Sequence, residues 1–389
     1  MSITAPEGFV AAGGAVGIKA GGAADLAVVA TEDGRAVPAA GVFTANLATA
    51  APVQVSRAHL AATGGKAAAV VLSSGNANAA TGAPGLEAAR HLCHLVATGV
   101  GAGTEEVLVC QTGLIGIPFP IDVVADAVGP VVSGRSATEE AAEAAAIAIM
   151  TTDTVPKVVT VRGRGFTVGG MAKGAAMLAP NMATMLAVLT TDAECEPSVL
   201  HELLSEAVGG TFNAMTVDGC TSTNDTVLVL ANGRAGAVDR SDLLGALSEA
   251  CGSLAAQMTA DAEGATKVAH VKVDGAHSDA EAHRAAKKVA DSLLVKCSLN
   301  GADPYWGRVV SELGSAGVAF DPDLVSVTYG GVAVCRDGVA ADHDTAAVAD
   351  HMAGRAVEIG CHLGLGEGSA VVLCTDLGYG YIDENRTTS

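Results

Sequence analysis

Short apolar runs alternate with glycine-bearing turns along the first third of the chain. Two such runs, over 67–73 and 105–110, predict buried strands. Helices are predicted over 85–100, where apolar residues recur on one face, and over 139–150, where alanine and glutamate dominate. Strands that alternate with helices in this way are typical of an α/β layered core.

The same pattern continues through the rest of the chain, which shows no linker, low-complexity tract or internal repeat. Further strands are predicted over 158–161, 166–168, 225–230 and 268–273, and further helices over 197–208, 241–258 and 279–294. The last part of the sequence mixes strands with glycine turns, and a C-terminal subdomain is expected from about residue 275.

One weakly polar stretch, over 168–189, is long enough to cross a bilayer. It contains Lys173, Pro180 and Asn181 together with several glycines, all of which a lipid-facing helix disfavours. We therefore expect this stretch to be buried protein core.

Composition and charge exclude several classes of partner. The chain is 50% apolar but only 3% aromatic, and its 48 glycines allow helices to pack closely on sheets. It carries 42 acidic against 22 basic residues, which argues against nucleic acid or an anionic membrane as a partner. The N-terminus shows no signal peptide, so we expect a cytoplasmic chain.

Familiar metal, nucleotide and hydrolase motifs are missing from the sequence. The nine cysteines are scattered singly and predict free thiols, not a disulfide framework or a zinc site. His91 and His94 are three apart and could share a metal, but no carboxylate motif accompanies them, so they are interpreted as helix surface. There is no Gly-x-Ser-x-Gly, His-Glu-x-x-His or Walker A motif, and we expect no metal or cofactor.

A single threonine, Thr184, follows the small residue Ala183 inside the apolar stretch. A threonine hydroxyl is a poor nucleophile until a base takes its proton, and an α-amino group with a pKa of about 8 can be that base. Thr184 gains a free α-amine only if the chain is cut between Ala183 and Thr184. On composition alone, the alternative is a buried strand in which the threonine is merely β-prone.

Ordered motifs along nearly all 389 residues decide between these interpretations. They lie over 41–46, 72–78, 111–116, 150–157, 171–192, 217–226, 261–267 and 301–308. Together they resemble the ornithine acetyltransferase family, the glutamate N-acetyltransferases of arginine biosynthesis (ArgJ type). The resemblance implies self-cleavage into an α-chain, 1–183, and a β-chain, 184–389, that begins with the nucleophile. It also implies a two-sheet α/β sandwich (DmpA/ArgJ-like) with a C-terminal α/β subdomain.

The resemblance also assigns the parts that acyl transfer needs. Thr184 would attack the acetyl carbonyl with its own α-amine as base, and the Thr112 hydroxyl and Gly113 N–H would stabilise the oxyanion. Lys173 would neutralise the substrate's α-carboxylate. Taken from the residues alone, Thr112 and Gly113 are equally a turn after a strand, and Lys173 a lysine at the edge of an apolar run.

The remaining substrate contacts implied by the resemblance are spread along the chain. Glu263 would pair with the ornithine-side amine, although a surface charge or helix cap is its alternative. Thr151 or Thr152 would contact the substrate, and the sequence does not choose between them. Asn385 and Ser389 match the family's C-terminal contacts, but the segment after Asn385 is one residue shorter than the family pattern. Tyr305 also stands where an asparagine is usual.

The resemblance implies an enzyme that moves acetyl from N2-acetylornithine to L-glutamate through an acetyl-threonine intermediate. Its cleaved fragments would stay associated as an α2β2 heterotetramer. Alternatives are a bifunctional enzyme that also uses acetyl-CoA and a paralogue that acts on another acylated amino acid in secondary metabolism. An aminopeptidase of similar fold, with serine as its nucleophile, and a non-catalytic scaffold are further alternatives.

Overall fold

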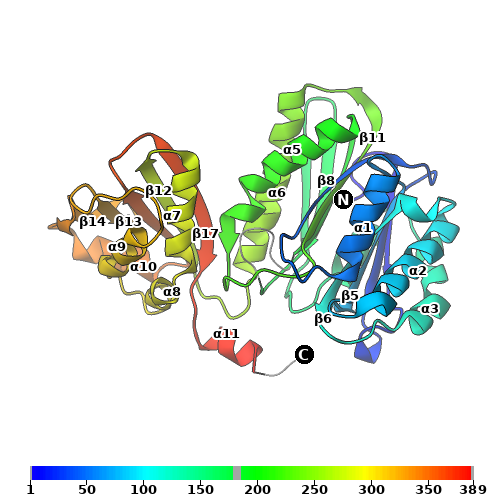
Figure 1. Ribbon diagram of the computed structural model, residues 1–389, viewed down its shortest axis with the longest axis horizontal. Coiled ribbons are helices and arrows are strands. Elements are labelled where there is room, and N and C mark those ends of the chain that lie inside the picture. Colours follow the sequence, from blue (N-terminus) through cyan, green and yellow to red (C-terminus); the bar gives the residue numbers. More distant parts are fainter. Residues whose placement is uncertain (1, 178–184, 387–389) are drawn as a thin grey trace. The chain divides into compact units, whose positions relative to one another are not determined.

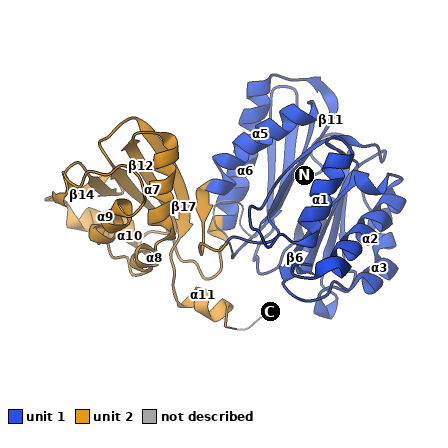
Figure 2. Ribbon diagram, viewed as in Figure 1, with its two compact units in different colours: residues 1–213, 221–258, 389 blue, residues 214–220, 259–388 orange. Residues whose placement is uncertain are grey.

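The computed structural model describes residues 2–177 and 185–386. These residues form two compact units (Figure 2). Unit 1 contains the described residues up to Asn213 together with Thr221–Met258, and unit 2 contains Ala214–Cys220 and the described residues from Thr259 onward. The C-terminal unit therefore begins before residue 275, because a strand over 268–276 belongs to its sheet. The division at the expected cleavage point, 183/184, stays a prediction.

Unit 1 contains a four-stranded sheet in the order β1-β2-β5-β6. Its strands are β1 (Phe9–Gly14), β2 (Leu26–Thr31), β5 (Ala69–Asn76) and β6 (Val107–Leu114). Strands β5 and β6 run parallel, whereas β2 pairs antiparallel with both β1 and β5. Residues 69–74 and 107–112 are all buried, which explains why the two strands read as continuous apolar runs and confirms their prediction.

The second sheet of unit 1 has six strands in the order β4-β3-β11-β9-β8-β7. They are β4 (Lys66–Ala67), β3 (Val37–Phe43), β11 (Thr226–Ala237), β9 (Leu186–Glu194), β8 (Thr167–Lys173) and β7 (Lys157–Arg162). Strands β8 and β9 flank the undescribed residues 178–184 and are buried almost throughout, so the described part of the apolar stretch is protein core. In the described part of the chain, no helix is long and apolar enough to span a membrane.

The two sheets pack face to face and enclose one hydrophobic core. Phe9, Val29 and Leu72 from the first sheet share this core with Val188 and Leu228 from the second. Burial of each large side chain of this kind contributes about 1.5–3 kcal/mol. Helix α4 (Glu139–Ala148) packs closely on β1, since a methyl group on Gly13 would lie 2.0 Å from the Ala144 carbonyl oxygen.

Helices cover the outer faces of both sheets, so unit 1 has four layers (Figure 1). Helices α1 (Ala51–Ala62), α2 (Gly82–Val100) and α3 (Ile121–Ser133) pack on the four-stranded sheet. Helices α5 (Pro197–Gly209) and α6 (Arg240–Ala260) pack on the six-stranded sheet. The predicted helices over 85–100, 139–150, 197–208 and 241–258 are confirmed, as is the two-sheet α/β sandwich.

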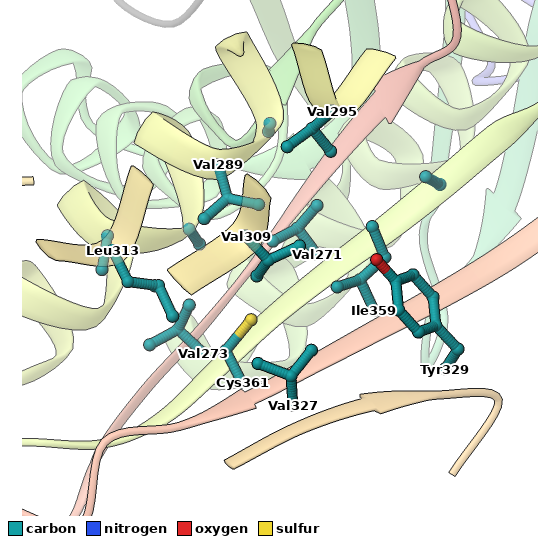
Figure 3. Packing of buried hydrophobic residues seen from close by; sticks show 14 of the residues in the cluster. Val271, Val273, Val289, Val295, Val309, Leu313, Val327, Tyr329, Ile359 and Cys361 are labelled. Atoms are coloured by element: carbon teal, nitrogen blue, oxygen red, sulfur yellow. The ribbon is translucent and has the colours of Figure 1, made fainter. Parts of the chain in front are cut away.

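Unit 2 is built on a seven-stranded sheet in the order β10-β17-β12-β16-β13-β14-β15. The strands are β10 (Met215–Thr216), β12 (Val268–Ala276), β13 (Ser326–Tyr329), β14 (Val332–Arg336), β15 (Val339–Ala340), β16 (Ala356–His362) and β17 (Gly368–Thr375). In β12 the side chains of Val271 and Val273 are buried, whereas His270 and Lys272 are exposed. One side of this strand therefore faces the core, shown in Figure 3.

The helices of unit 2 are α7 (Asp279–Asp291), α8 (Leu293–Asn300), α9 (Trp306–Gly314), α10 (Thr345–Ala353) and α11 (Tyr379–Glu384). The prediction of one helix over 279–294 is wrong at its C-terminal end. Ser292 has extended backbone angles, φ −65° and ψ 120°, and its side chain caps α8 by accepting a hydrogen bond from the N–H of Val295. A serine that can serve as an N-cap therefore divides the helix in two.

Candidate active site

The carboxyl ends of β5 and β6 meet at one edge of the four-stranded sheet, where Gly75 lies opposite Gly113. Gly113 has φ +132°, a conformation that side-chain-bearing residues rarely adopt. A Cβ atom there would also lie 2.3 Å from the carbonyl carbon of Gly75. Only glycine fits this position, and the exposed Gly113 follows the buried Thr112 directly.

Buried amide side chains hold the chain just before Thr112. Asn78 donates a hydrogen bond to Oε1 of Gln111 at 2.8 Å, and Asn224 donates to the backbone carbonyl of Gln111 at 2.8 Å. The same Asn224 amide donates to the carbonyl of Ala77 at 2.6 Å. Each polar group is paired inside the protein, which fixes the course of β6 up to the expected oxyanion residues.

A buried charge cluster lies next to Thr112. Lys173, the last residue of β8, has its Nζ 3.4 Å from the Thr112 hydroxyl oxygen and 3.9 Å from Oδ2 of Asp153. Lys157, the first residue of β7, donates to Oδ1 of Asp153 at 2.6 Å, and both side chains are 0% exposed. The structure thus brings together Lys173 and Thr112, two residues that the sequence analysis names. Asp153, the carboxylate beside them, is not among the residues predicted from the sequence.

Asp153 is ionised within this cluster. Burial opposes its charge, but the ammonium groups of Lys173 and Lys157 outweigh burial and lower the pKa of Asp153 to about 2. The backbone N–H groups of Thr151 and Gly174 also donate to its carboxylate, at 3.0 and 2.7 Å. Asp153 and Lys157 lie in the motif over 150–157. The spacing of an acid four residues before a lysine is the sequence feature that could have indicated this ion pair.

Thr151 and Thr152 are exposed and line a cavity of about 460 Å³ that also reaches Gly113. The other described residues that line this cavity are Ile18, Lys19, Ala20, Gly75 and Leu114. Both threonines therefore remain candidates for the substrate contact. Lys19 was not identified from the sequence, because its segment follows β1 with no motif of its own.

Thr184 and Ala183, the expected nucleophile and the residue before it, lie outside the described residues. Met185, the next residue along the chain, donates its backbone N–H to Oδ1 of Asp225 at 2.9 Å. Asp225 is fully buried, and its Oδ2 accepts no hydrogen bond from the described residues. Burial raises the pKa of Asp225 well above its ordinary value, although the Met185 N–H and the charge of Lys173 partly oppose that rise.

A second group of predicted residues lies within unit 2. The side-chain amide of Asn385 donates to Oε2 of Glu263 at 2.7 Å and to the backbone carbonyl of Tyr381 at 2.9 Å. Gly264, with φ +62°, allows this approach, since a Cβ there would lie 2.1 Å from the nitrogen of Tyr381. Glu263 and Asn385 are thus brought together, whereas Ser389 lies outside the described residues.

Among the residues that the structure describes, no group of three or more histidine, cysteine or acidic side chains could hold a metal ion. His91 and His94 both lie on α2 and are exposed. The Nδ1 atom of His94 lies 3.3 Å from the hydroxyl of Thr104. The chemistry available at the site is that of hydroxyl, backbone amide, ammonium and carboxylate groups.

The sequence model of one protein family, described as the ArgJ family, matches residues 10–387. A relative named arginine biosynthesis bifunctional protein ArgJ, from Mycolicibacterium paratuberculosis, is 47% identical over all of this chain and 96% of its own length. The protein of the same name from Thermobifida fusca is 45% identical over the whole of both chains.

Two solved structures are also similar. The bifunctional protein ArgJ from Bacillus halodurans is 33% identical, with a TM-score of 0.49, over 51% of this chain and 96% of its own. The ornithine acetyltransferase from Mycobacterium tuberculosis, solved with ornithine, is 43% identical, with a TM-score of 0.44, over 48% of this chain and 96% of its own.

Proposed function

We propose, since this chain belongs to the ArgJ family, that it is a self-processing threonine acetyltransferase of arginine biosynthesis. It moves acetyl from N2-acetylornithine to L-glutamate and needs no metal or cofactor. Two relatives that this chain matches over 96% and 100% of their own length are named arginine biosynthesis proteins, which supports the assignment to that pathway. The two fragments of each chain act together in the cytoplasm as an α2β2 assembly.

Maturation creates the catalytic base. The Thr184 hydroxyl attacks the carbonyl carbon of Ala183, the peptide C–N bond breaks, and an ester replaces it. Water hydrolyses that ester, leaving a carboxylate on Ala183 and a free α-amine on Thr184. The 38.2 kDa chain then consists of fragments of roughly 18 and 20 kDa.

Acetyl transfer then occurs in two half-reactions. The α-amine of Thr184 takes the proton of its own hydroxyl, and the oxygen attacks the acetyl carbonyl of N2-acetylornithine. The oxyanion is stabilised by the Thr112 hydroxyl and the Gly113 N–H, the C–N bond breaks, and ornithine leaves with the proton. The α-amine of glutamate attacks the acetyl-threonine ester in the same way, which releases N-acetylglutamate and restores the hydroxyl.

The observation that carries this proposal is the position of Lys173 beside Thr112. When the Lys173 ammonium donates to the Thr112 oxygen, the hydroxyl proton is left to donate elsewhere, as an oxyanion donor must. The Asp153 carboxylate lies 3.9 Å from the Lys173 ammonium, and the same ammonium can attract the α-carboxylate of donor or acceptor. Glu263 and Asn385 supply the carboxylate and amide for the ornithine side.

Mass spectrometry and steady-state kinetics test the proposal together. The wild-type protein should give two fragments that separate after Ala183, and Thr184→Ala should stay one inactive chain. Initial-rate plots at several fixed glutamate concentrations should be parallel, and acid quenching should leave an acetyl group on the Thr184 peptide. A single intact chain that nevertheless transfers acetyl would show that the α-amine is not the base.

A second activity is supported by the names of the relatives, which call them bifunctional. The enzyme would also acetylate glutamate with acetyl-CoA. Incubation of the purified enzyme with glutamate and acetyl-CoA, without any ornithine compound, tests this. Sustained formation of N-acetylglutamate at a rate near that of the acetylornithine reaction would establish the second donor, and its absence would leave acetylornithine as the donor.

A further inference from the structure

We infer that Lys19 binds the side-chain carboxylate of the glutamate acceptor and so selects that acceptor. The inference rests on the proposed function, because it names a specificity contact of the same site. It is carried by the position of Lys19 in the cavity wall next to Gly113 and Thr152.

The loop that carries Lys19 is held in place by one buried carboxylate. Asp25, the residue directly before β2, accepts hydrogen bonds from the backbone N–H of Val16 at 2.6 Å and from those of Ile18 and Lys19 at 2.6 and 2.9 Å. Its side chain is fully buried. Because both carboxylate oxygens are bound to the loop backbone, the Cα atom of Lys19 is fixed relative to β2.

The ammonium of Lys19 is directed by two carbonyl groups. Its Nζ donates to the carbonyl of Ala24 at 3.0 Å and to that of Met150 at 2.6 Å. Met150 directly precedes Thr151, so this bond joins Lys19 to the threonine pair. An ammonium has three N–H donors, and the two carbonyls use two of them. No ion pair joins Lys19 to a carboxylate of the described residues, so its charge is available to a ligand.

The stem of Lys19 lies against the glycine pair at the strand ends. A Cβ atom on Gly75 would lie 3.0 Å from Cγ of Lys19, and Gly75 is paired with Gly113 in the sheet. The side chain of Lys19 therefore runs beside the backbone that would bind the oxyanion. The residue Lys19 as a whole is half-buried and lines the cavity, so a small ligand in the cavity would contact it.

Two cations at this site match the two carboxylates of glutamate. The attacking atom of the acceptor is its α-amine, and the α-carboxylate lies only two bonds away, which suits Lys173 beside Thr112. The side-chain carboxylate lies further along the molecule and needs a separate cation, which the half-exposed Lys19 supplies. Burial lowers the pKa of Lys19, Asp25 opposes this and Lys173 adds to it. A ligand carboxylate would favour the charged form of Lys19.

N2-acetylornithine carries an ammonium in its side chain and gains nothing from Lys19. The inference therefore separates the two half-reactions: Lys19 serves the acceptor and Glu263 the donor. Glutamine is a neutral analogue of glutamate with nearly the same shape, so it isolates the charge of the side chain from its size.

The test compares acceptors on the purified, cleaved enzyme. Wild-type enzyme, Lys19→Gln and the control Lys66→Gln, which alters an exposed lysine of unit 1, are each given acetylornithine with glutamate, glutamine or labelled ornithine. In Lys19→Gln the kcat/KM for glutamate should fall about tenfold to a hundredfold, with less than a threefold change for ornithine. The preference for glutamate over glutamine should disappear. Equal losses for all acceptors, or an unchanged preference, would overturn the inference.

A second measurement keeps the inference testable if Lys19→Gln fails to fold. Reductive methylation of the wild-type enzyme, followed by peptide mass spectrometry, reports the access of reagent to Lys19. Glutamate should protect Lys19 at least threefold more than glutamine at equal concentration, and equal protection would count against the assignment. A wild-type enzyme that transfers acetyl to no acceptor would refute the proposed function, whereas Lys19 labelling would still report glutamate binding.

Discussion

The Nζ atom of Lys173 lies 3.4 Å from the hydroxyl oxygen of Thr112, and both side chains are buried. One residue ends a strand of the six-stranded sheet and the other lies near the end of a strand of the four-stranded sheet. The contact therefore joins the two sheets at the site. A buried ammonium that donates to a hydroxyl oxygen leaves the hydroxyl proton for another acceptor.

Thr112→Val tests this use of the hydroxyl. Valine keeps the shape of threonine and removes the donor, so kcat should fall about a hundredfold to a thousandfold, as when an oxyanion donor is lost. Thr112→Ser should keep at least a tenth of the activity. Both variants must first be shown to be cleaved and folded; if Thr112→Val then stays within threefold of wild type, Thr112 is not an oxyanion donor.

Gly113→Ala should destabilise the protein by more than 3 kcal/mol, on the order expected for backbone strain combined with overpacking. Gly116→Ala is the matched control, because Gly116 also has a positive φ, +83°, but an added Cβ would meet nothing within 4 Å. The control should lose only about 1–2 kcal/mol. Chemical denaturation of the three proteins measures the difference, and equal losses would mean that the contact with Gly75 costs little.

Asp153→Asn should destabilise the enzyme strongly, because it removes the charge of the buried carboxylate to which the Lys157 ammonium donates at 2.6 Å. Removal of one partner of a buried ion pair typically costs about 3–5 kcal/mol. The exposed acid Asp33, which pairs with Arg35 on the surface, provides the control Asp33→Asn, which should change stability by less than about 1 kcal/mol. Similar losses in the two variants would indicate that the buried pair of Asp153 and Lys157 contributes little to stability.

The lowered pKa of Asp153 also predicts how stability depends on acid. Its pKa is about 2 in the folded protein and lies near 3.9 in an unfolded chain. Its contribution, on the order of 2 kcal/mol, is complete above about pH 4 and is lost as the pH falls towards 2. Unfolding experiments between pH 5 and pH 2 should give a smaller pH dependence for Asp153→Asn than for wild type.

Asp225→Asn should behave in the opposite way. A raised pKa means that the folded state holds the proton more tightly, so wild type loses stability as the pH rises above about 4. Asparagine is neutral and its Oδ1 can still accept from the Met185 N–H, so the variant should gain on wild type in melting temperature between pH 4 and pH 8. A deficit that grows as the pH rises would show that the ionised carboxylate is needed.

Glu263→Gln should reduce kcat/KM for acetylornithine more than for glutamate. The amide keeps an oxygen that can accept from Asn385 but removes the charge that attracts the ornithine-side amine. The control Glu367→Gln alters an exposed acid of unit 2 and should affect neither substrate. If Glu263→Gln loses the same factor for both substrates, Glu263 has a structural role or one common to both half-reactions.

The sequence predicts those parts of this fold in which burial leaves a local pattern. Strands β5 and β6 were predicted as apolar runs, because almost every side chain in them is covered. The end of α7 was missed, because the helical pattern continues past Ser292 and only its backbone angles reveal the break. Element boundaries of this kind depend on capping geometry more than on periodicity.

The site was predictable where a family motif named a residue, and not where distant segments create its surroundings. Asp153 and Lys157, four residues apart, resemble a solvated surface pair in the sequence. Their complete burial comes from strands and loops remote in the chain, which no local pattern reports. Lys19 was missed for the same reason, since the cavity that it lines combines four separate segments.

The hydrogen bonds from three backbone amides to Asp25 affect how this loop can evolve. The path of residues 16–19 is held by a carboxylate outside the loop, so the side chain at position 19 can change without removing these hydrogen bonds. Mutation can therefore place a different side chain at position 19 while the backbone there keeps its position. A protein engineer who wishes to redirect acceptor choice can do the same, provided that Asp25 is left untouched.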